Sequence, residues 1–232
     1  MYRHGRLVGL VLCASALAGG CGETVREFVA PEPLKADPKV VGELREFVWT
    51  IGEEDEDGQL KLRLWCKKKG LDRRATVAAL CDLLHDKEVY RRSFVTQALG
   101  EMGDERAVPV LIEKLLDEAE HPWLRWEFAR ALGKIGDRRA VQPLLKTVTS
   151  EQWQLRHSSV CALGWIGDEG TFDVIAAALG DKNPAVRKEA CEALQDFGSK
   201  RGIDPLRKLL EKEDDAKVIA AAKKAIEVLV TK

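Results

Sequence analysis

A short motif recurs along most of the chain at a nearly constant spacing. Its central leucine falls at Leu99, Leu132, Leu163 and Leu194, so that successive copies lie 33, 31 and 31 residues apart. A weaker copy places Ile226 a further 32 residues along. A period of this length is typical of arrays of stacked helical units, in which no unit buries its apolar face alone. We therefore expect an extended array rather than a single closed core.

The copy around Leu132 predicts two helices joined by a tight turn. Its apolar residues recur at i, i+4, i+7 and i+8, which makes one stripe along the first helix. Gly133 and Gly136 follow, and we interpret both as the left-handed end of that helix. Asp137 is expected to cap the second helix. The predicted stripes are Leu124, Phe128, Ala131 and Leu132 in the first helix, and Val141, Leu144, Leu145 and Val148 in the second.

With these motifs the chain resembles the short HEAT-like repeats of the phycobilisome-lyase type. The resemblance rests on the copies LGEMGDERAVPVLIEKL, LGKIGDRRAVQPLLKTV and LGWIGDEGTFDVIAAAL, and it extends over residues 72–230. It implies an all-α fold, a right-handed α-solenoid of helical-hairpin repeats of 31–33 residues. Ankyrin and tetratricopeptide arrays have similar periods, but their signature motifs are absent.

The beginning of the chain predicts a lipoprotein signal peptide over residues 1–20. A basic start precedes the uncharged run Leu7–Leu17, which is too short to span a bilayer because a spanning helix needs about 20 apolar residues. The small residues before Cys21 resemble the lipobox of bacterial lipoproteins, although Ala18 stands where that family prefers leucine. The resemblance implies a lipidated Cys21. Because Gly22 is not aspartate, it also implies the outer membrane, facing the periplasm. An ordinary signal peptide with an incidental cysteine is the alternative.

The rest of the chain divides into a tether, a leading cap and the array. Residues 21–38 contain three prolines and little periodicity, which predicts a tether after the lipidated cysteine. Residues 39–58 are expected to form a leading capping helix and an acidic loop. The HEAT-like array with its closing helix is expected over residues 59–232. This organisation predicts a lipid-anchored protein of the bacterial cell envelope.

Cysteine and histidine are too few and too widely spaced to predict a catalytic or metal centre. No C-x-x-C motif occurs, and no histidine has a partner at ligand spacing. We therefore expect no cofactor, no metal and no enzymatic activity. The cysteines beyond the leader and Cys21 are interpreted either as buried small side chains or as disulfide pairs in an oxidising envelope. They are Cys66, Cys81, Cys161 and Cys191.

The charge balance favours a protein partner over a nucleic acid. The chain carries 37 basic and 38 acidic residues, for a net charge of -1, whereas a nucleic-acid surface wants a continuous basic stripe. We thus expect a membrane-tethered scaffold that binds another protein of the envelope. The alternatives are a bilin lyase-like enzyme subunit, suggested by the family resemblance, and a purely structural spacer of the envelope.

Two charged positions recur from copy to copy. The family resemblance implies that they form an Arg–Asp ladder between stacked turns, and a row of binding residues is the alternative. The arginine position holds Arg92, Arg125, Arg156 and Arg187, and the aspartate position holds Asp104, Asp137 and Asp168.

The candidate binding residues lie on two faces. The resemblance implies that the second helices line a concave face, and we expect their basic residues to bracket an acidic partner segment around Asp173. Trp126 and Trp165 occupy first-helix positions that are polar in most other copies, so we expect them to be exposed there, as partner anchors or as ordinary surface aromatics. The second-helix candidates are Arg106, Arg138, Arg139, Gln142, Lys146, Asp173, Arg201 and Lys208.

Overall fold

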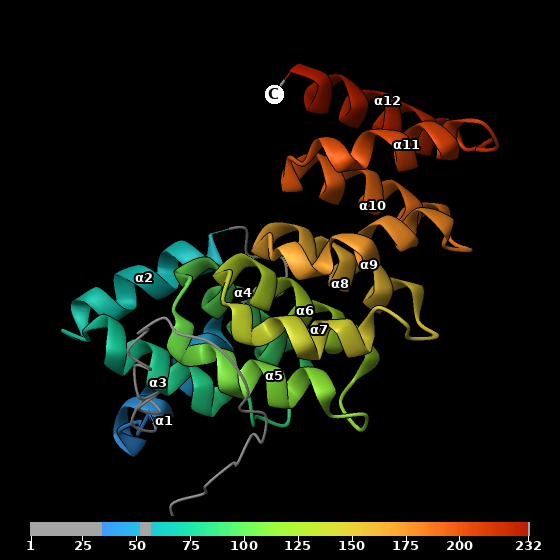
Figure 1. Cartoon of the computed structure of the whole chain (residues 1–232). Coiled ribbons are helices and arrows are strands. Elements are labelled where there is room, and N and C mark those ends of the chain that lie inside the picture. The colour runs from blue at the N-terminus through green and yellow to red at the C-terminus, as the bar shows by residue number, and fades with distance from the viewer. Residues whose placement is uncertain (1–33, 52–56, 232) are drawn as a thin grey trace, which may run out of the picture. The chain divides into compact units, whose positions relative to one another are not determined.

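The computed structural model describes residues 34–51 and 57–231, which belong to one compact unit. The predicted signal peptide, Cys21, most of the tether and the acidic loop lie outside these residues. Within residues 34–51 and 57–231 every regular element is helical (Figure 1). None of these helices has the length and apolarity to cross a membrane.

Most hairpins consist of a long first helix, a 3₁₀ turn and a shorter second helix. In chain order the helices are α1 (Pro38–Thr50), α2 (Gly58–Lys68), α3 (Arg73–Leu83), α4 (Val89–Met102), α5 (Val108–Leu116), α6 (Pro122–Ile135), α7 (Val141–Thr147), α8 (Trp153–Ile166), α9 (Phe172–Ala177), α10 (Pro184–Phe197), α11 (Ile203–Leu210) and α12 (Ala216–Thr231). The turns before the second helices are η1 (Glu105–Ala107), η2 (Arg138–Ala140), η3 (Glu169–Thr171) and η5 (Lys200–Gly202).

The first helices form a continuous row. Helix α4 packs on α6, α6 on α8, α8 on α10 and α10 on α12, and the second helices α5, α7 and α11 pack on the first helix that follows each of them. At the N-terminal end, α1 packs on α3 and α3 packs on α4. The predicted all-α solenoid of stacked hairpins is confirmed.

The predicted apolar stripes are the surfaces that hold this row together. Leu124, Phe128, Ala131 and Leu132 of α6 are buried. In α7, Val141 and Leu144 are buried, whereas Leu145 and Val148 are half-buried against the same core.

The two glycines at the end of α6 have different roles, which corrects the prediction. Gly136 has a positive φ of 76° and ends the helix as expected. Gly133 instead lies within α6, where a Cβ atom would lie 2.6 Å from the Cα atom of Ala162 on α8. Gly100 and Gly164 make corresponding approaches to Ala131 and Ala193. This glycine position therefore lets consecutive first helices lie against each other.

Candidate functional site

The arginines at the start of the first helices form an interhelical ladder. Arg156 donates to both carboxylate oxygens of Asp181 at 2.7 Å, and to the carbonyl oxygens of Ser150 and Glu151. It thereby ties α8 to the loop on each side. The same row contains Arg92 with Glu120, Arg187 with Glu213, and Arg125, whose Nε donates to the Leu115 carbonyl oxygen.

The recurring aspartates do not meet these arginines, which corrects the predicted Arg–Asp ladder. Asp104 follows α4, a helix of 14 residues that is about 20 Å long, so it lies at the opposite end from Arg92. Its side chain accepts from the backbone of Arg106 and opens turn η1. Asp137 and Asp168 open turns η2 and η3 in the same way. The two charged rows therefore stabilise opposite ends of the hairpins.

The second-helix arginines are already held by contacts within the chain. Arg106 pairs with Asp104 at 2.7 Å, and Arg139 pairs with Asp137 and donates to the carbonyl oxygen of Glu105. Arg138 lies 3.6 Å from Asp168.

Arg201 lies 3.3 Å from Asp173 and covers the Phe172 ring. Arg201 therefore already pairs with Asp173, the residue around which an acidic partner segment is expected from the sequence. The other candidates on this side, Gln142, Lys146 and Lys208, are exposed.

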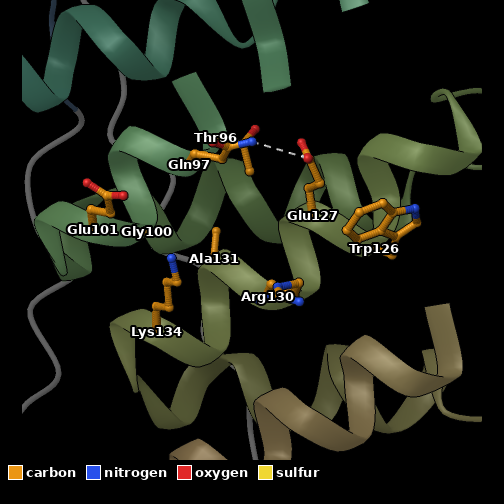
Figure 2. Close-up of a pocket in the computed structure, with 9 residues that line it drawn as sticks. All are labelled: Thr96, Gln97, Gly100, Glu101, Trp126, Glu127, Arg130, Ala131 and Lys134. Carbon is orange, nitrogen blue, oxygen red and sulfur yellow. Dashed lines mark hydrogen bonds between the residues drawn. The ribbon is translucent and has the colours of Figure 1, made fainter. Parts of the chain in front are cut away.

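The first-helix side carries a groove between α4 and α6, with a volume of about 350 Å³ (Figure 2). Its floor is the close approach of the two helices, where a Cβ on Gly100 would lie 3.1 Å from the Cα of Ala131. Figure 2 shows Trp126 at one end and Lys134 with Glu101 at the other. Thr96, Gln97, Glu127 and Arg130 complete the lining.

Glu127 is the buried acid of this groove. Its side chain is 7% exposed, and among the described residues its Oε2 atom has no hydrogen-bond partner. Its Oε1 atom accepts from Nε2 of Gln97 at 3.4 Å, the dashed line in Figure 2. Burial raises the pKa of Glu127, and the polar groups of Ser93, Gln97 and Trp123 oppose this effect only in part.

The two predicted tryptophans both lie on this side of the array. Trp165 on α8 is 41% exposed as expected, whereas Trp126 is half-buried in the groove wall, which corrects the expectation that it is exposed. The guanidinium carbon of Arg130 lies 6.0 Å from the centre of the Trp165 ring, so Arg130 extends from α6 towards α8. The surface therefore continues from the groove to the next hairpin.

Sequence reasoning missed the groove itself. Glu127, Arg130 and Lys134 were not among the predicted site residues. The signal that could have found Glu127 is its repeat position, which holds Phe94, Ser158 and Glu189 in other copies. A carboxylate at a position that elsewhere holds phenylalanine is a candidate for a buried charge.

The cysteines do not form a reactive centre. Cys66, Cys81, Cys161 and Cys191 are all unpaired, and burial raises the pKa of each thiol. A thiol with a raised pKa is a poor nucleophile because the thiolate is the reactive form. Among the residues that the structure describes, no group of three or more His, Cys, Asp or Glu side chains is placed to hold a metal ion.

Comparisons with known proteins match this architecture. The family model of HEAT repeats matches residues 77–160 and 141–227. The chain is similar to the complex of CpcE and CpcF of phycocyanin lyase from Nostoc sp. PCC7120, at 23% identity with a TM-score of 0.57, over 67% of this chain and 65% of that chain. It therefore spans less than two thirds of the length of that relative.

Two artificial proteins are similar over more of the chain. A designed armadillo repeat protein in complex with peptide (KR)4 is 19% identical, with a TM-score of 0.54, over 81% of this chain and 99% of that chain. An engineered protein is 21% identical, with a TM-score of 0.54, over 82% and 97%. No curated protein matches the chain. At these identities the structural likenesses show the fold alone.

Proposed function

Because this chain belongs to the HEAT-repeat family, we propose that it is a non-enzymatic scaffold that binds a partner protein at the bacterial cell envelope. Proteins of this fold bind other proteins or peptides along the extended surfaces that stacked repeats create. The partner is bound by the first-helix face, which we define as the exposed side of α4, α6 and α8. Lipidated Cys21 holds the scaffold at the membrane.

The observation that carries this proposal is the contrast between the two sides of the array. On the second-helix side, Arg106, Arg139 and Arg201 are engaged by aspartates of the chain itself. On the first-helix face, a groove is lined by Trp126 and Arg130, and Arg130 extends from it to the ring of Trp165. Tryptophans and arginines accessible beside a concave surface are residue types that dominate binding energy in protein interfaces.

Site-specific crosslinking in intact cells tests which face binds. A photo-reactive phenylalanine analogue placed at Lys134, which lines the groove on α6, is expected to form an adduct with one distinct protein. The matched control is the same analogue at Lys146, which is exposed on α7. Adducts at position 146 and none at 134 would assign the partner to the second-helix side. Adducts at neither position would favour a structural spacer.

Membrane tethering needs its own test, because Cys21 lies outside the described residues. The variant Cys21→Ser is expected to lose lipid labelling and to leave the membrane fraction, since acyl chains supply the affinity for the bilayer. The matched control is Cys81→Ser, a half-buried cysteine of α3, which is expected to remain lipid-labelled and membrane-bound. A Cys21→Ser protein that is still processed and lipid-labelled would refute the anchor.

A bilin lyase role is the enzymatic alternative. The likeness to the CpcE and CpcF complex, at 23% identity, supports a shared fold and no shared chemistry. Mixing the purified protein with a bilin and an acceptor phycobiliprotein is expected to leave the absorbance spectrum unchanged. A new absorbance band that survives denaturation would show covalent attachment and would refute the non-enzymatic scaffold.

A further inference from the structure

Two carboxylates occupy the same repeat position in different hairpins and have different surroundings. Glu189 on α10 meets the preceding first helix, where Nε2 of His157 lies 3.1 Å from its Oε2 atom. Burial raises the pKa of Glu189, but hydrogen bonds from His157 and Cys161 outweigh it and leave the pKa lowered. The carboxylate between α8 and α10 is therefore satisfied by side chains of the protein.

Between α4 and α6 the corresponding partners are different residues. In the repeat alignment, Ser93 occupies the position of His157, and Gln97 occupies the position of Cys161. A serine side chain is much shorter than an imidazole and cannot fill the same space. The polar groups of Ser93, Gln97 and Trp123 act on Glu127, but the hydrogen bond from Gln97 is long and the Oε2 atom has no hydrogen-bond partner among the described residues. The groove of about 350 Å³ lies beside this carboxylate.

A buried carboxylate oxygen without a hydrogen-bond donor is unfavourable, and a group that supplies a donor is stabilised there. The charge of Arg130 lowers the pKa of Glu127, but Arg130 extends towards Trp165 and Lys134 lies at the end of the groove away from Trp126 (Figure 2). Neither cation donates a hydrogen bond to the Oε2 atom. Trp126 gives the groove a flat apolar wall next to Glu127. A guanidinium fits this pair of surfaces, since it donates to carboxylates and stacks on aromatic rings.

We propose that the groove between α4 and α6 binds one arginine side chain of a partner polypeptide, with the guanidinium on Glu127 and its stem against Trp126. This inference rests on the proposed function and specifies the chemistry of its binding face. Arg130 and Lys134 line the same groove and balance the charges of Glu101 and Glu127, so that each bound arginine adds an excess positive charge. The preferred segment therefore has a single arginine flanked by acidic residues, which these two cations attract.

The test measures binding of a fluorescent capped pentapeptide, Glu-Ala-Arg-Ala-Glu, to the full-length protein in detergent. The comparison peptide carries citrulline, which keeps the shape of arginine and lacks its charge. The arginine peptide is expected to bind at least about tenfold more tightly than the citrulline peptide, because a hydrogen bond to a charged group is lost. Equal binding of the two peptides, or no binding of the arginine peptide at millimolar concentration, would overturn the inference.

The variant Glu127→Gln identifies the acceptor. It is close in shape to the wild type and is expected to remove the tenfold preference for arginine over citrulline. Glu169→Gln, at an exposed carboxylate of turn η3, makes the same charge change and is expected to keep the preference. A preference unchanged in Glu127→Gln would overturn the inference. If Glu127→Gln does not fold, the difference in affinity between the arginine and citrulline peptides for the wild-type protein still tests the inference.

The failure of this inference can be distinguished from the failure of the proposed function. A partner crosslinked at position 134 together with no preference for arginine would retain the scaffold and reject the arginine site. Crosslinking at position 146 alone would reject the first-helix face as the binding face, whatever the peptides show.

Discussion

Gly133 on α6 faces Ala162 on α8 so closely that a Cβ atom on the glycine would lie 2.6 Å from the Cα atom of the alanine. Real Cβ atoms do not approach backbone atoms to this distance, so two packed helices would have to separate. The contact recurs between α4 and α6 and between α8 and α10, at Gly100 and Gly164. The spacing of the first helices therefore depends on the absence of a side chain at one repeat position.

Adding a methyl group at this position should destabilise the array. We expect Gly133→Ala to lower the free energy of unfolding by about 1–3 kcal/mol, the usual effect of overpacking a tight contact. The control is Gly42→Ala in α1, where the new methyl group meets nothing within 4 Å and helix propensity should raise stability by about 0.5–1 kcal/mol. Urea unfolding measures both, and equal effects would contradict the close-contact role.

The hairpins were predictable because their apolar stripes and their terminal glycines repeat. The role of Gly133 was not, because a glycine that permits a left-handed turn and a glycine that permits a close approach look alike in a single sequence. The sequence predicts a left-handed conformation for Gly133 and for Gly136, and only Gly136 has the positive φ of that conformation. Only the position of the neighbouring helix separates the two roles.

The arginine ladder should contribute more to stability than the exposed pairs of the second helices. Arg156 and Asp181 have side chains that are 6% and 12% exposed and form two hydrogen bonds. Arg156→Lys loses this fork and leaves a buried carboxylate poorly paired, so we expect a loss of about 3 kcal/mol.

The matched control is Arg201→Lys at an exposed pair. Arg201 and Asp173 have side chains that are 58% and 87% exposed. Exposed pairs contribute less than about 1 kcal/mol, so this variant should lose little stability. Chemical unfolding compares the two, and a loss at Arg201→Lys as large as that at Arg156→Lys would contradict the ranking.

Acid should weaken the ladder within a defined pH range. The guanidinium of Arg187 lowers the pKa of Glu213 from 4.5 to about 2. A folded-state pKa below the unfolded value means that the unfolded chain binds the proton first. The contribution of Glu213 is therefore complete above pH 4.5 and is lost as the pH falls from 4.5 to about 2.

Urea midpoints measured across this range check the prediction. Arg187→Met removes the largest cause of the lowered pKa, so this variant should lose less additional stability between these pH values than the wild type. Parallel pH profiles for the two proteins would contradict the assignment.

The candidate site could be predicted only in part. Comparison of copies indicated that Trp126 and Trp165 lie on an exposed face, because their repeat positions are mostly polar elsewhere. The family resemblance selected Arg139 as a second-helix residue, but it could not show that the aspartate two residues earlier pairs with that guanidinium. Glu127 was missed because its environment depends on Ser93 and Gln97, which lie one hairpin earlier in the chain.

The last prediction concerns Glu189, whose histidine partner can be replaced by the serine found in the corresponding position of the α4–α6 pair. His157→Ser gives the α8–α10 hairpins the serine that Ser93 provides between α4 and α6, and it removes the imidazole partner of Glu189 while Cys161 stays in place. The loss of that contact should lower the free energy of unfolding by about 1–3 kcal/mol. Glu189 would then lie beside new space without its imidazole donor. Because Lys188 stands where the groove has the flat wall of Trp126, the arginine peptide should still bind with a stoichiometry of one. His85→Ser, at an exposed histidine, is the control and should change neither quantity. A stoichiometry of two would show that a carboxylate without its imidazole partner is enough to bind arginine, and would contradict the role given to Trp126, which has no aromatic counterpart at Lys188.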